Sequence, residues 1–336
     1  MRSTQRFPRN QPVIETDCLR LDELGPGVHR LKIELAQDGA CNPIQVPVQV
    51  FRGHQEGPVV GITAAVHGNE VNGIPAIHRL LRRLDVAELK GTVVAAAPVN
   101  VPGFLANVRE FRDGKDLNRL FPGKPDGNES QVFANAIVDR IVRRFDYLLD
   151  LHTASFGRIN SLYIRADMSR PVTAELSRAV RPQIILHNPS HGDGTLRGAA
   201  EELGIHALTV EIGDPSRTQA ELVRCSSTGL RDVLEHLGMV APDEESPPGE
   251  AVECVKSSWL YTDSGGMLEV FPEVVQRVKK GEVVAQLLNE WGEVTRVFEA
   301  PADGIVIGRS TNPVAHSGAR ILHYGIEGKV EVVDPL

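Results

Sequence analysis

The first two thirds of the chain alternate short apolar runs with amphipathic segments. The run 58–63 is typical of a buried strand, and the apolar residues at 74–84 follow it with the spacing of one helix face. Similar patterns predict strands at 91–98, 147–152, 161–164, 183–186 and 206–211, and helices at about 130–141, 173–180, 195–203 and 218–237. Ser130 is the expected N-cap of the first of these helices. Strands that alternate with helices predict an α/β fold with a mixed, largely parallel sheet flanked by helices.

The pattern differs at both ends of this region. Residues 13–52 look β-rich, and 46–50 alternate apolar and polar positions as in a half-exposed strand. The segment 241–250 is acidic and rich in proline, which is typical of a linker. Beyond it the helical periodicity is lost, and short apolar runs alternate with glycines, as in a small β-sandwich or barrel. We therefore predict one domain at 1–240 and an all-β domain at 251–336.

Composition and charge narrow the function classes. The chain has 336 residues and a formal net charge of −8, which disfavours nucleic acid or an anionic membrane surface as a partner. No apolar run approaches the roughly 18 residues of a membrane span, and residues 1–11 lack the apolar core of a signal peptide. The four cysteines form no CxxC pair. We expect a cytoplasmic protein with reduced thiols, and the sequence leaves open whether it forms a homo-oligomer.

A candidate metal site begins at the turn that follows the strand at 58–63. His67 and Glu70 lie three residues apart on this turn, so an imidazole and a carboxylate can converge on one ion. A catalytic zinc needs a third protein ligand, and His152 at the end of the strand 147–152 is the natural one. This set would leave one coordination position for water. The alternative is a turn histidine and a surface glutamate at a helix start, where the macrodipole favours a negative charge.

Glu211 follows the apolar run 206–210. In open α/β sheets, sites form at the carboxyl ends of strands, and His67, His152 and Glu211 all fall at such ends. Close to the metal, Glu211 would serve as a general base and then as a general acid, with its pKa raised by partial desolvation. The alternative is a strand-end carboxylate that points into solvent.

The loop sequence DLNRLFPG at 116–123 is a second constellation. Arg119 carries a planar guanidinium that can bind a carboxylate through two hydrogen bonds, and Asn118 adds neutral donors. Asp116 could accept a hydrogen bond from a ligand imidazole and so fix its tautomer. The alternative is a loop with an ordinary salt bridge.

Four motifs in order resemble the succinylglutamate desuccinylase and aspartoacylase family, whose members are relatives of the zinc carboxypeptidases. These motifs are HGNE, DLNRLFPG, DLHT and VEIG. The resemblance runs over about 58–237 and implies a zinc-carboxypeptidase-like fold. It also implies one Zn²⁺ bound by His67, Glu70 and His152, with Glu211 as the acid/base.

The same resemblance implies roles for the second constellation. Asn118 and Arg119 would hold a substrate carboxylate, and Asp116 matches an aspartate that supports a metal ligand in the family. The family also places an arginine before DLNR, where it polarises the scissile carbonyl. Arg109 and Arg112 both lie in that segment. We favour Arg109 because of its spacing from the residues upstream, and Arg112 stays the alternative.

Two further features extend the comparison. Arg197 is either a second carboxylate-binding residue or a solvated helix arginine. The region 251–336 also resembles a biotinyl/lipoyl-type hybrid β domain, but it lacks the Met-Lys or Asp-Lys pair at which such a carrier is modified. We therefore expect a structural lid that narrows the mouth of the active site, and no covalently attached cofactor.

The sequence thus predicts a zinc-dependent hydrolase that cleaves the amide bond of an N-acyl amino acid or of a similar small acylated amine bearing a carboxylate. Residues 1–240 would form its catalytic domain. The nearer alternative is a metallocarboxypeptidase that acts on short peptides with the same metal and base. The distant alternative is a non-catalytic carboxylate-binding protein on the same scaffold. The acyl group and the amine stay open.

Overall fold

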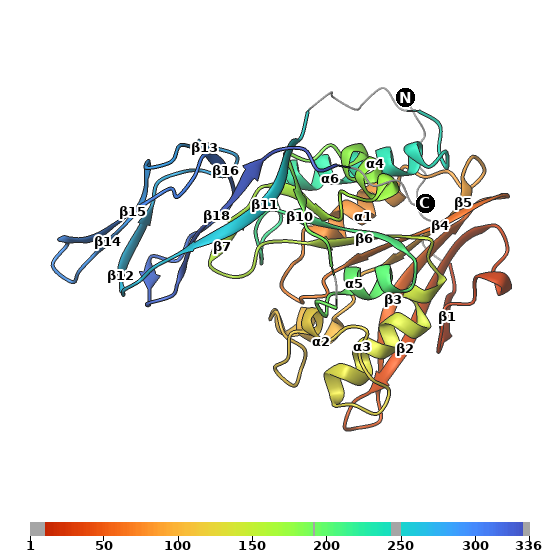
Figure 1. Ribbon diagram of the computed structural model, residues 1–336. Helices are drawn as coiled ribbons and strands as arrows, with labels where there is room; N and C mark the ends of the chain where they lie inside the picture. Colours follow the sequence, from red (N-terminus) through yellow and green to blue (C-terminus); the bar gives the residue numbers. More distant parts are fainter. Residues whose placement is uncertain (1–10, 191, 243–249, 332–336) are drawn as a thin grey trace.

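The structure is a computed structural model that describes residues 11–190, 192–242 and 250–331 (Figure 1). The strands up to residue 212 are β1 (Val13–Thr16), β2 (Gly27–Gln37), β3 (Pro43–Arg52), β4 (Gln55–Ala64), β5 (Lys90–Ala96), β6 (Tyr147–His152), β7 (Arg158–Asn160), β8 (Leu162–Ala166), β9 (Ile184–His187) and β10 (His206–Ile212). The later strands are β11 (Val252–Tyr261), β12 (Gly266–Val270), β13 (Arg277–Val278), β14 (Val283–Leu288), β15 (Val294–Glu299), β16 (Gly304–Ser310), β17 (Val314–Ala315) and β18 (Arg320–Glu327). The predictions for residues 1–11 and for the linker at 241–250 fall mostly outside the described residues.

The helices occupy the segments between the strands of the first region. They are α1 (Gly73–Leu81), α2 (Val101–Ala106), α3 (Glu129–Arg140), α4 (Pro171–Ala179), α5 (Leu196–Glu202) and α6 (Ala220–His236), with short 3₁₀ turns at Leu21–Glu23, Leu117–Arg119 and Val142–Arg144. Of the described helices, none is long and apolar enough to cross a membrane.

One large sheet organises the molecule. Its order is β1-β2-β3-β5-β4-β6-β10-β8-β9-β11-β18-β16-β13. Parallel pairing joins β5, β4, β6 and β10, and it also joins β8, β9 and β11. Between these two blocks, β8 runs antiparallel to β10. The predicted α/β fold with a mixed, largely parallel sheet is therefore confirmed.

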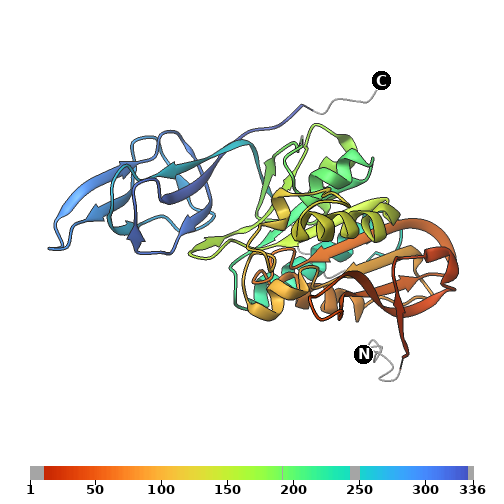
Figure 2. The ribbon, with the colours of Figure 1, turned by 90° about the horizontal axis from the view of Figure 1, so that it is seen from below.

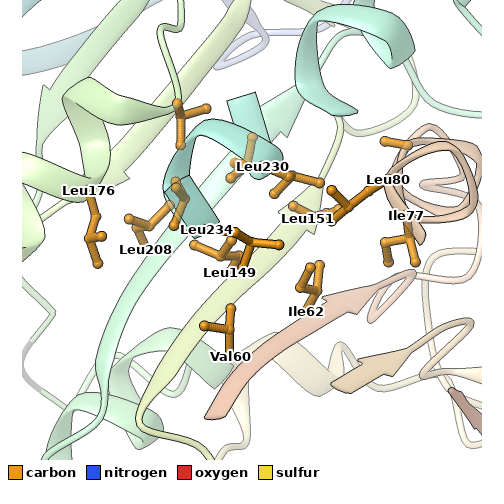
Figure 3. Packing of buried hydrophobic residues seen from close by; sticks show 14 of the residues in the cluster. Val60, Ile62, Ile77, Leu80, Leu149, Leu151, Leu176, Leu208, Leu230 and Leu234 are labelled. Carbon is orange, nitrogen blue, oxygen red and sulfur yellow. The ribbon is translucent and has the colours of Figure 1, made fainter. Parts of the chain in front are cut away.

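Helices cover both faces of this sheet. On one face, residues of α1, α4 and α6 pack against alternate residues of β4, β6 and β10, and Figure 3 shows this packing around Ile62, Leu149 and Leu208. On the other face, α3 and α5 pack against the sheet and form a second buried cluster. Because both faces are covered, the central strands read as continuous apolar runs, which is why the sequence revealed them so clearly.

The C-terminal strands form a small β domain beside the α/β body (Figure 2). A second sheet, of order β15-β14-β12-β17, packs with β11, β16 and β18 around its own apolar cluster. Helices do not occur in the described part of this region, 250–331, so the predicted small all-β domain is confirmed. It is joined to the body by hydrogen bonds as well as by the chain, because β11 pairs with β9 and β16 pairs with β7.

One local prediction is wrong. The N-cap of α3 is Asn128, whose side chain accepts a hydrogen bond from the backbone N–H of Gln131, and the Gln131 side chain accepts one from the Asn128 N–H in return. Ser130 lies inside the helix, buried, and its hydroxyl donates to Asp113. Both Asn and Ser are good N-caps, and the reciprocal bonds with Gln131 favour the earlier start.

Candidate metal centre and active site

The turn after β4 holds the first two predicted metal ligands. Ala65, just past the strand, adopts a left-handed φ of 57°, and the Glu70 N–H donates to the His67 carbonyl at 3.0 Å. Gly68 lies so close to the backbone of Gly103 that a Cβ would collide with it. Only glycine can be accommodated this close to another backbone segment, so the turn that carries His67 and Glu70 packs tightly against the backbone at Gly103.

His152 completes the group. It is the last residue of β6, the strand next to β4. Like His67 and Glu70, it is buried. Its Nδ1 lies 2.9 Å from Glu70 Oε2 and 3.2 Å from His67 Nδ1, while His67 Nδ1 lies 2.9 Å from Glu70 Oε1. The structure therefore brings the three predicted ligands together, with ligand atoms within 4.8 Å of one another.

Two carboxylates fix the orientation of the imidazoles. His67 Nε2 lies 3.0 Å from Asp116 Oδ1, and His152 Nε2 lies 2.8 Å from Asp150 Oδ2. When each Nε2 donates its proton to its carboxylate, each Nδ1 presents a lone pair to the other across 3.2 Å. Two facing lone pairs beside a carboxylate repel one another unless a cation lies between them, so this donor set fits a divalent metal.

The carboxylates at the centre are kept ionised by their partners. Burial opposes ionisation of Glu70, but the adjacent imidazoles outweigh it and hold its pKa below the ordinary value. The same balance lowers the pKa of Asp116, where His67 and Arg109 outweigh partial burial. Negative charge is therefore available where a metal would need it.

Asp150 is a residue of the candidate site that the sequence analysis did not predict. It is fully buried, and its second oxygen accepts a hydrogen bond from the Thr63 hydroxyl at 2.6 Å. Strand periodicity could have found it, because residues two apart in a strand share a face and Asp150 precedes His152 by two.

Glu211 lies beside the predicted ligands. It is opposite His152 in the parallel β6–β10 pair and is only 9% exposed, so the alternative of a solvent-pointing carboxylate is wrong. Its Oε1 lies 3.4 Å from Arg165 Nε, and its Oε2 accepts from Asn160 Nδ2 at 3.2 Å. Burial raises the pKa of Glu211 above its ordinary value, and Arg165 opposes that rise.

The structure separates the two candidate arginines of the segment before DLNR. Arg109 lines the cavity at the candidate metal site, with Nη1 2.7 Å from Glu70 Oε1 and Nη2 2.9 Å from Asp116 Oδ2. Arg112 forms an exposed pair with Glu129 instead and does not line this cavity. Of the two, only Arg109 lies where it could contact a substrate carbonyl.

The second constellation also lies at the cavity. Asn118 accepts a hydrogen bond from the Leu196 N–H at 2.8 Å through Oδ1, so its side-chain Nδ2 group remains as a donor for a ligand. Arg119 lines the same wall and donates to the Asn118 carbonyl. Arg197 lines the cavity too, but it is only 2% exposed, so the alternative of a solvated helix arginine is wrong.

The cavity has a volume of about 610 Å³ and a wall rich in guanidinium groups. Arg109, Arg119, Arg158, Arg165, Arg197 and Arg320 all line it. Trp259 and Arg320 come from the C-terminal domain, and the guanidinium carbons of Arg158 and Arg320 lie 5.4 and 5.2 Å from the indole centroid. Burial and the nearby charge of Arg320 lower the pKa of Arg158.

No sequence motif identifies four of the residues that line the cavity, namely Arg158, Arg165, Trp259 and Arg320. They reach the cavity only because β8 inserts antiparallel beside β10 and because the C-terminal domain docks on the body. Such pairings between distant segments are not encoded by a local pattern.

A comparison with protein families assigns the chain to a family. The model of the succinylglutamate desuccinylase/aspartoacylase catalytic domain matches residues 56–237. The chain belongs to the succinylglutamate desuccinylase/aspartoacylase family. The matched span runs from the second residue of β4 past β10 and contains every candidate ligand and Glu211.

Relatives in this family resemble most of the chain. An N-alpha-acetyl-L-2,4-diaminobutyric acid deacetylase of Halomonas elongata is 26% identical over 316 residues, which cover 90% of this chain and 91% of the relative. A succinylglutamate desuccinylase of Pseudomonas paraeruginosa is 30% identical over 243 residues, covering 67% and 72%. Both names describe the removal of an acyl group from an amino acid.

Solved structures show the same fold. A succinylglutamate desuccinylase/aspartoacylase of Rhodobacter sphaeroides superimposes with a TM-score of 0.82 at 24% identity, covering 93% of this chain and 99% of that one. The product-bound ectoine utilization protein EutE of Ruegeria pomeroyi gives 0.81 at 23% identity, covering 90% and 96%. The C-terminal β domain is therefore part of the shared architecture of these family members.

Proposed function

We propose that this chain is a zinc-dependent deacylase that hydrolyses the amide bond of an N-acyl amino acid or of a similar small acylated amine. The observation that carries the proposal is the His67, Glu70 and His152 group, whose imidazoles are held by carboxylates and whose neighbour is the buried Glu211. The deacetylase and desuccinylase relatives support the same reaction class. One Zn²⁺ per chain would be bound by the three ligands.

The chain's own residues would then divide the chemistry. When bound, zinc would supply Lewis acidity to a carbonyl oxygen and lower the pKa of a water toward about 7. Glu211 would accept the proton of the attacking water and return it to the leaving amine. Arg109, held by Glu70 and Asp116, would donate to the oxyanion that develops on the scissile carbonyl. A preorganised donor of this kind is worth roughly 3 kcal/mol.

The cavity wall supports a substrate that carries a carboxylate. Arg109, Arg165 and Arg197 each have an acidic partner, whereas among the described ion pairs Arg119, Arg158 and Arg320 have none. We assign Arg119 and Asn118 to the substrate carboxylate, with Arg197 as a further contact. These contacts would place the amide against Glu211 and so convert binding energy into orientation.

A hydrolysis screen tests this function. Zinc-loaded protein would be incubated with acetyl-, succinyl- and formyl-amino acids, with acylated diamines, and with short peptides, and the products read by mass spectrometry. We expect turnover of at least one N-acyl amino acid or acylated diamine that exceeds turnover of every peptide. Preferential release of C-terminal residues from peptides would favour a metallocarboxypeptidase. Stoichiometric binding without turnover would favour a carboxylate-binding protein.

We also propose that the domains divide at the segment 241–250 and that the protein is cytoplasmic. All four cysteines are unpaired, which agrees with a reducing compartment. Limited proteolysis with mass spectrometry of the fragments would test the domain boundary, and cell fractionation would test the location.

A further inference from the structure

One short strand of the body, β7, connects the C-terminal domain with the surroundings of Glu211. β7 extends from the body between β6 and β8 and pairs antiparallel with β16 of the C-terminal domain. Backbone hydrogen bonds close this pairing at both ends. Thr311 N–H donates to the Gly157 carbonyl at 2.8 Å, and Ser161 N–H donates to the Ile307 carbonyl at 3.0 Å. The position of β7 is thus set by a strand that lies some 150 residues later in the chain.

Asn160, the last residue of β7, links this pairing to Glu211. Asn160 is opposite Gly308 in the β7–β16 register. Its side-chain Nδ2 donates to Glu211 Oε2 at 3.2 Å. Arg165 engages the other carboxylate oxygen, Oε1, at 3.4 Å. Each oxygen of the Glu211 carboxylate therefore has its own partner, and one partner is carried by a strand that the C-terminal domain holds.

Gly308 is packed directly against this link. A Cβ at position 308 would collide with the amide oxygen of Asn160 and would lie 2.8 Å from the carbonyl oxygen of Ile159. The pairing of β16 with β18 shifts register between Val306 and Gly308. Irregularities of this kind re-aim neighbouring side chains, and here the neighbour is the residue that contacts Glu211.

We infer that the C-terminal β domain positions Glu211 through Asn160. This inference rests on the proposed role of Glu211 as the general base. A glutamate side chain has several rotatable bonds, and a base must lie within hydrogen-bond reach of the proton that it takes. The Asn160 and Arg165 contacts restrict those rotations. Asn160 is therefore a positioning residue, and the C-terminal domain is part of the catalytic apparatus.

Removal of the Asn160 side chain is the first test. In Asn160→Ala the Nδ2 donor is lost and no atom is added, so we expect kcat to fall about 10- to 100-fold, as for other residues that orient a catalytic group. KM and zinc content should stay near those of the wild type. Asn160→Asp keeps the side-chain size but places a second carboxylate beside Glu211, and we expect a larger loss of kcat. A wild-type kcat for Asn160→Ala would overturn the inference.

A double-mutant cycle tests the link to the C-terminal domain. Gly308→Ala should lower kcat because the new methyl group displaces Asn160, and combining it with Asn160→Ala should add little further loss. Gly265→Ala is the matched control in the same domain, since a Cβ there meets only the Ala315 carbonyl at an ordinary 3.4 Å. Losses that multiply in the double variant, or a wild-type kcat for Gly308→Ala, would overturn the link.

Effects on folding and on the proposed role of Glu211 are measured separately. Melting temperature and zinc content are measured for each variant, and Asn160→Ala alone decides the inference if Gly308→Ala does not fold. Glu211→Gln is assayed in parallel. If Glu211→Gln loses turnover while Asn160→Ala keeps it, only this inference fails. If Glu211→Gln keeps turnover, the proposed role of Glu211 fails.

Discussion

The imidazoles at the candidate metal centre are aimed by residues that do not touch the metal position. Asp116 holds His67 from the loop before the 3₁₀ turn at 117–119, and Asp150 holds His152 from within the same strand. A ring at a strand end could otherwise rotate about its side-chain bonds. Two independent supports therefore set the geometry of the site.

Replacement of Glu211 tests the proposed base. Glu211→Gln keeps the size of the side chain and removes its ability to accept a proton at neutral pH. We expect zinc content to be unchanged and kcat to fall by about 10²- to 10⁴-fold, the usual contribution of a general base. Steady-state kinetics with metal analysis measures both quantities, and a kcat close to that of the wild type would remove Glu211 from this role.

Replacement of Asp150 tests the support of His152. Asp150→Asn removes the negative charge that accepts from His152 Nε2, so we expect zinc affinity to fall about 10- to 100-fold. Competition with a chromophoric chelator measures the affinity. Asp139→Asn is the control, because Asp139 lies on the surface and, among the described residues, forms an ion pair only with Arg143. Equal zinc affinity of Asp150→Asn and the control would contradict the claim that Asp150 supports His152 as a ligand.

At this scale the sequence predicted what lies in local motifs. His67, Glu70, His152 and Glu211 could be placed because each lies at the end of a recognisable apolar strand or in the turn after it. Arg165 could not, because its place beside Glu211 depends on the antiparallel pairing of β8 with β10, which joins the two parallel blocks of the sheet. A local pattern can therefore locate a residue at a strand end. It cannot locate a residue whose position depends on which strands pair in the sheet.

Among the elements, strands buried on both faces were predicted most closely. The run predicted at 147–152 is β6 without change, and the turn after β4 leads into α1 as expected. Helix starts depend on single hydrogen bonds, and the start of α3 was placed two residues late at Ser130. The three-residue β7 has no pattern of its own, since three residues show no periodicity.

The start of α3 gives a prediction for stability. Asn128→Ala removes the side-chain acceptor for the Gln131 N–H, so we expect the free energy of unfolding to fall by about 1 kcal/mol. Urea denaturation of the zinc-loaded protein measures it. An unchanged unfolding midpoint for Asn128→Ala would show that the helix does not depend on this cap.

On the scale of the whole molecule, the sheet that positions the candidate metal ligands continues into the C-terminal domain through β9 and β11. The resemblance of residues 251–336 to a biotinyl/lipoyl-type domain without its modification site predicted a lid, and the structure places Trp259 and Arg320 of this domain in the cavity wall. The sequence could not predict these contacts, because the docking of β16 on β7 joins segments about 150 residues apart. The sequence pattern was enough to predict an α/β region and an all-β region, but not the contacts between them.

The junction also contains a buried histidine that gives a pH prediction. His323 is 2% exposed, stacks on Trp259 with ring centroids 4.8 Å apart, and contacts the Ser257 hydroxyl at 2.8 Å. Burial, reinforced by the charges of Arg165 and other nearby arginines, keeps the pKa of His323 well below its ordinary value. The neutral ring is therefore the form that the folded state accommodates.

The sign of the effect follows from this depressed pKa. Above about pH 6.5 the ring is neutral in both states, and below it the unfolded chain binds a proton that the folded protein does not, so stability falls. At pH 5.5 the loss is about 1.4 kcal/mol. Urea denaturation between pH 7.5 and 5.5 should show a shallower dependence for His323→Gln than for the wild type. Identical dependence in the two proteins would contradict this account.

The central claim is that amide hydrolysis depends on zinc held by His67, Glu70 and His152. The most direct measurement is turnover of the N-acyl substrate found in the screen, before chelation, after metal loss verified by elemental analysis, and after addition of Zn²⁺. We predict loss of turnover with the metal and its return with one zinc per chain, and no return in a His152→Ala variant. Undiminished hydrolysis by protein shown to be free of metal would contradict the account.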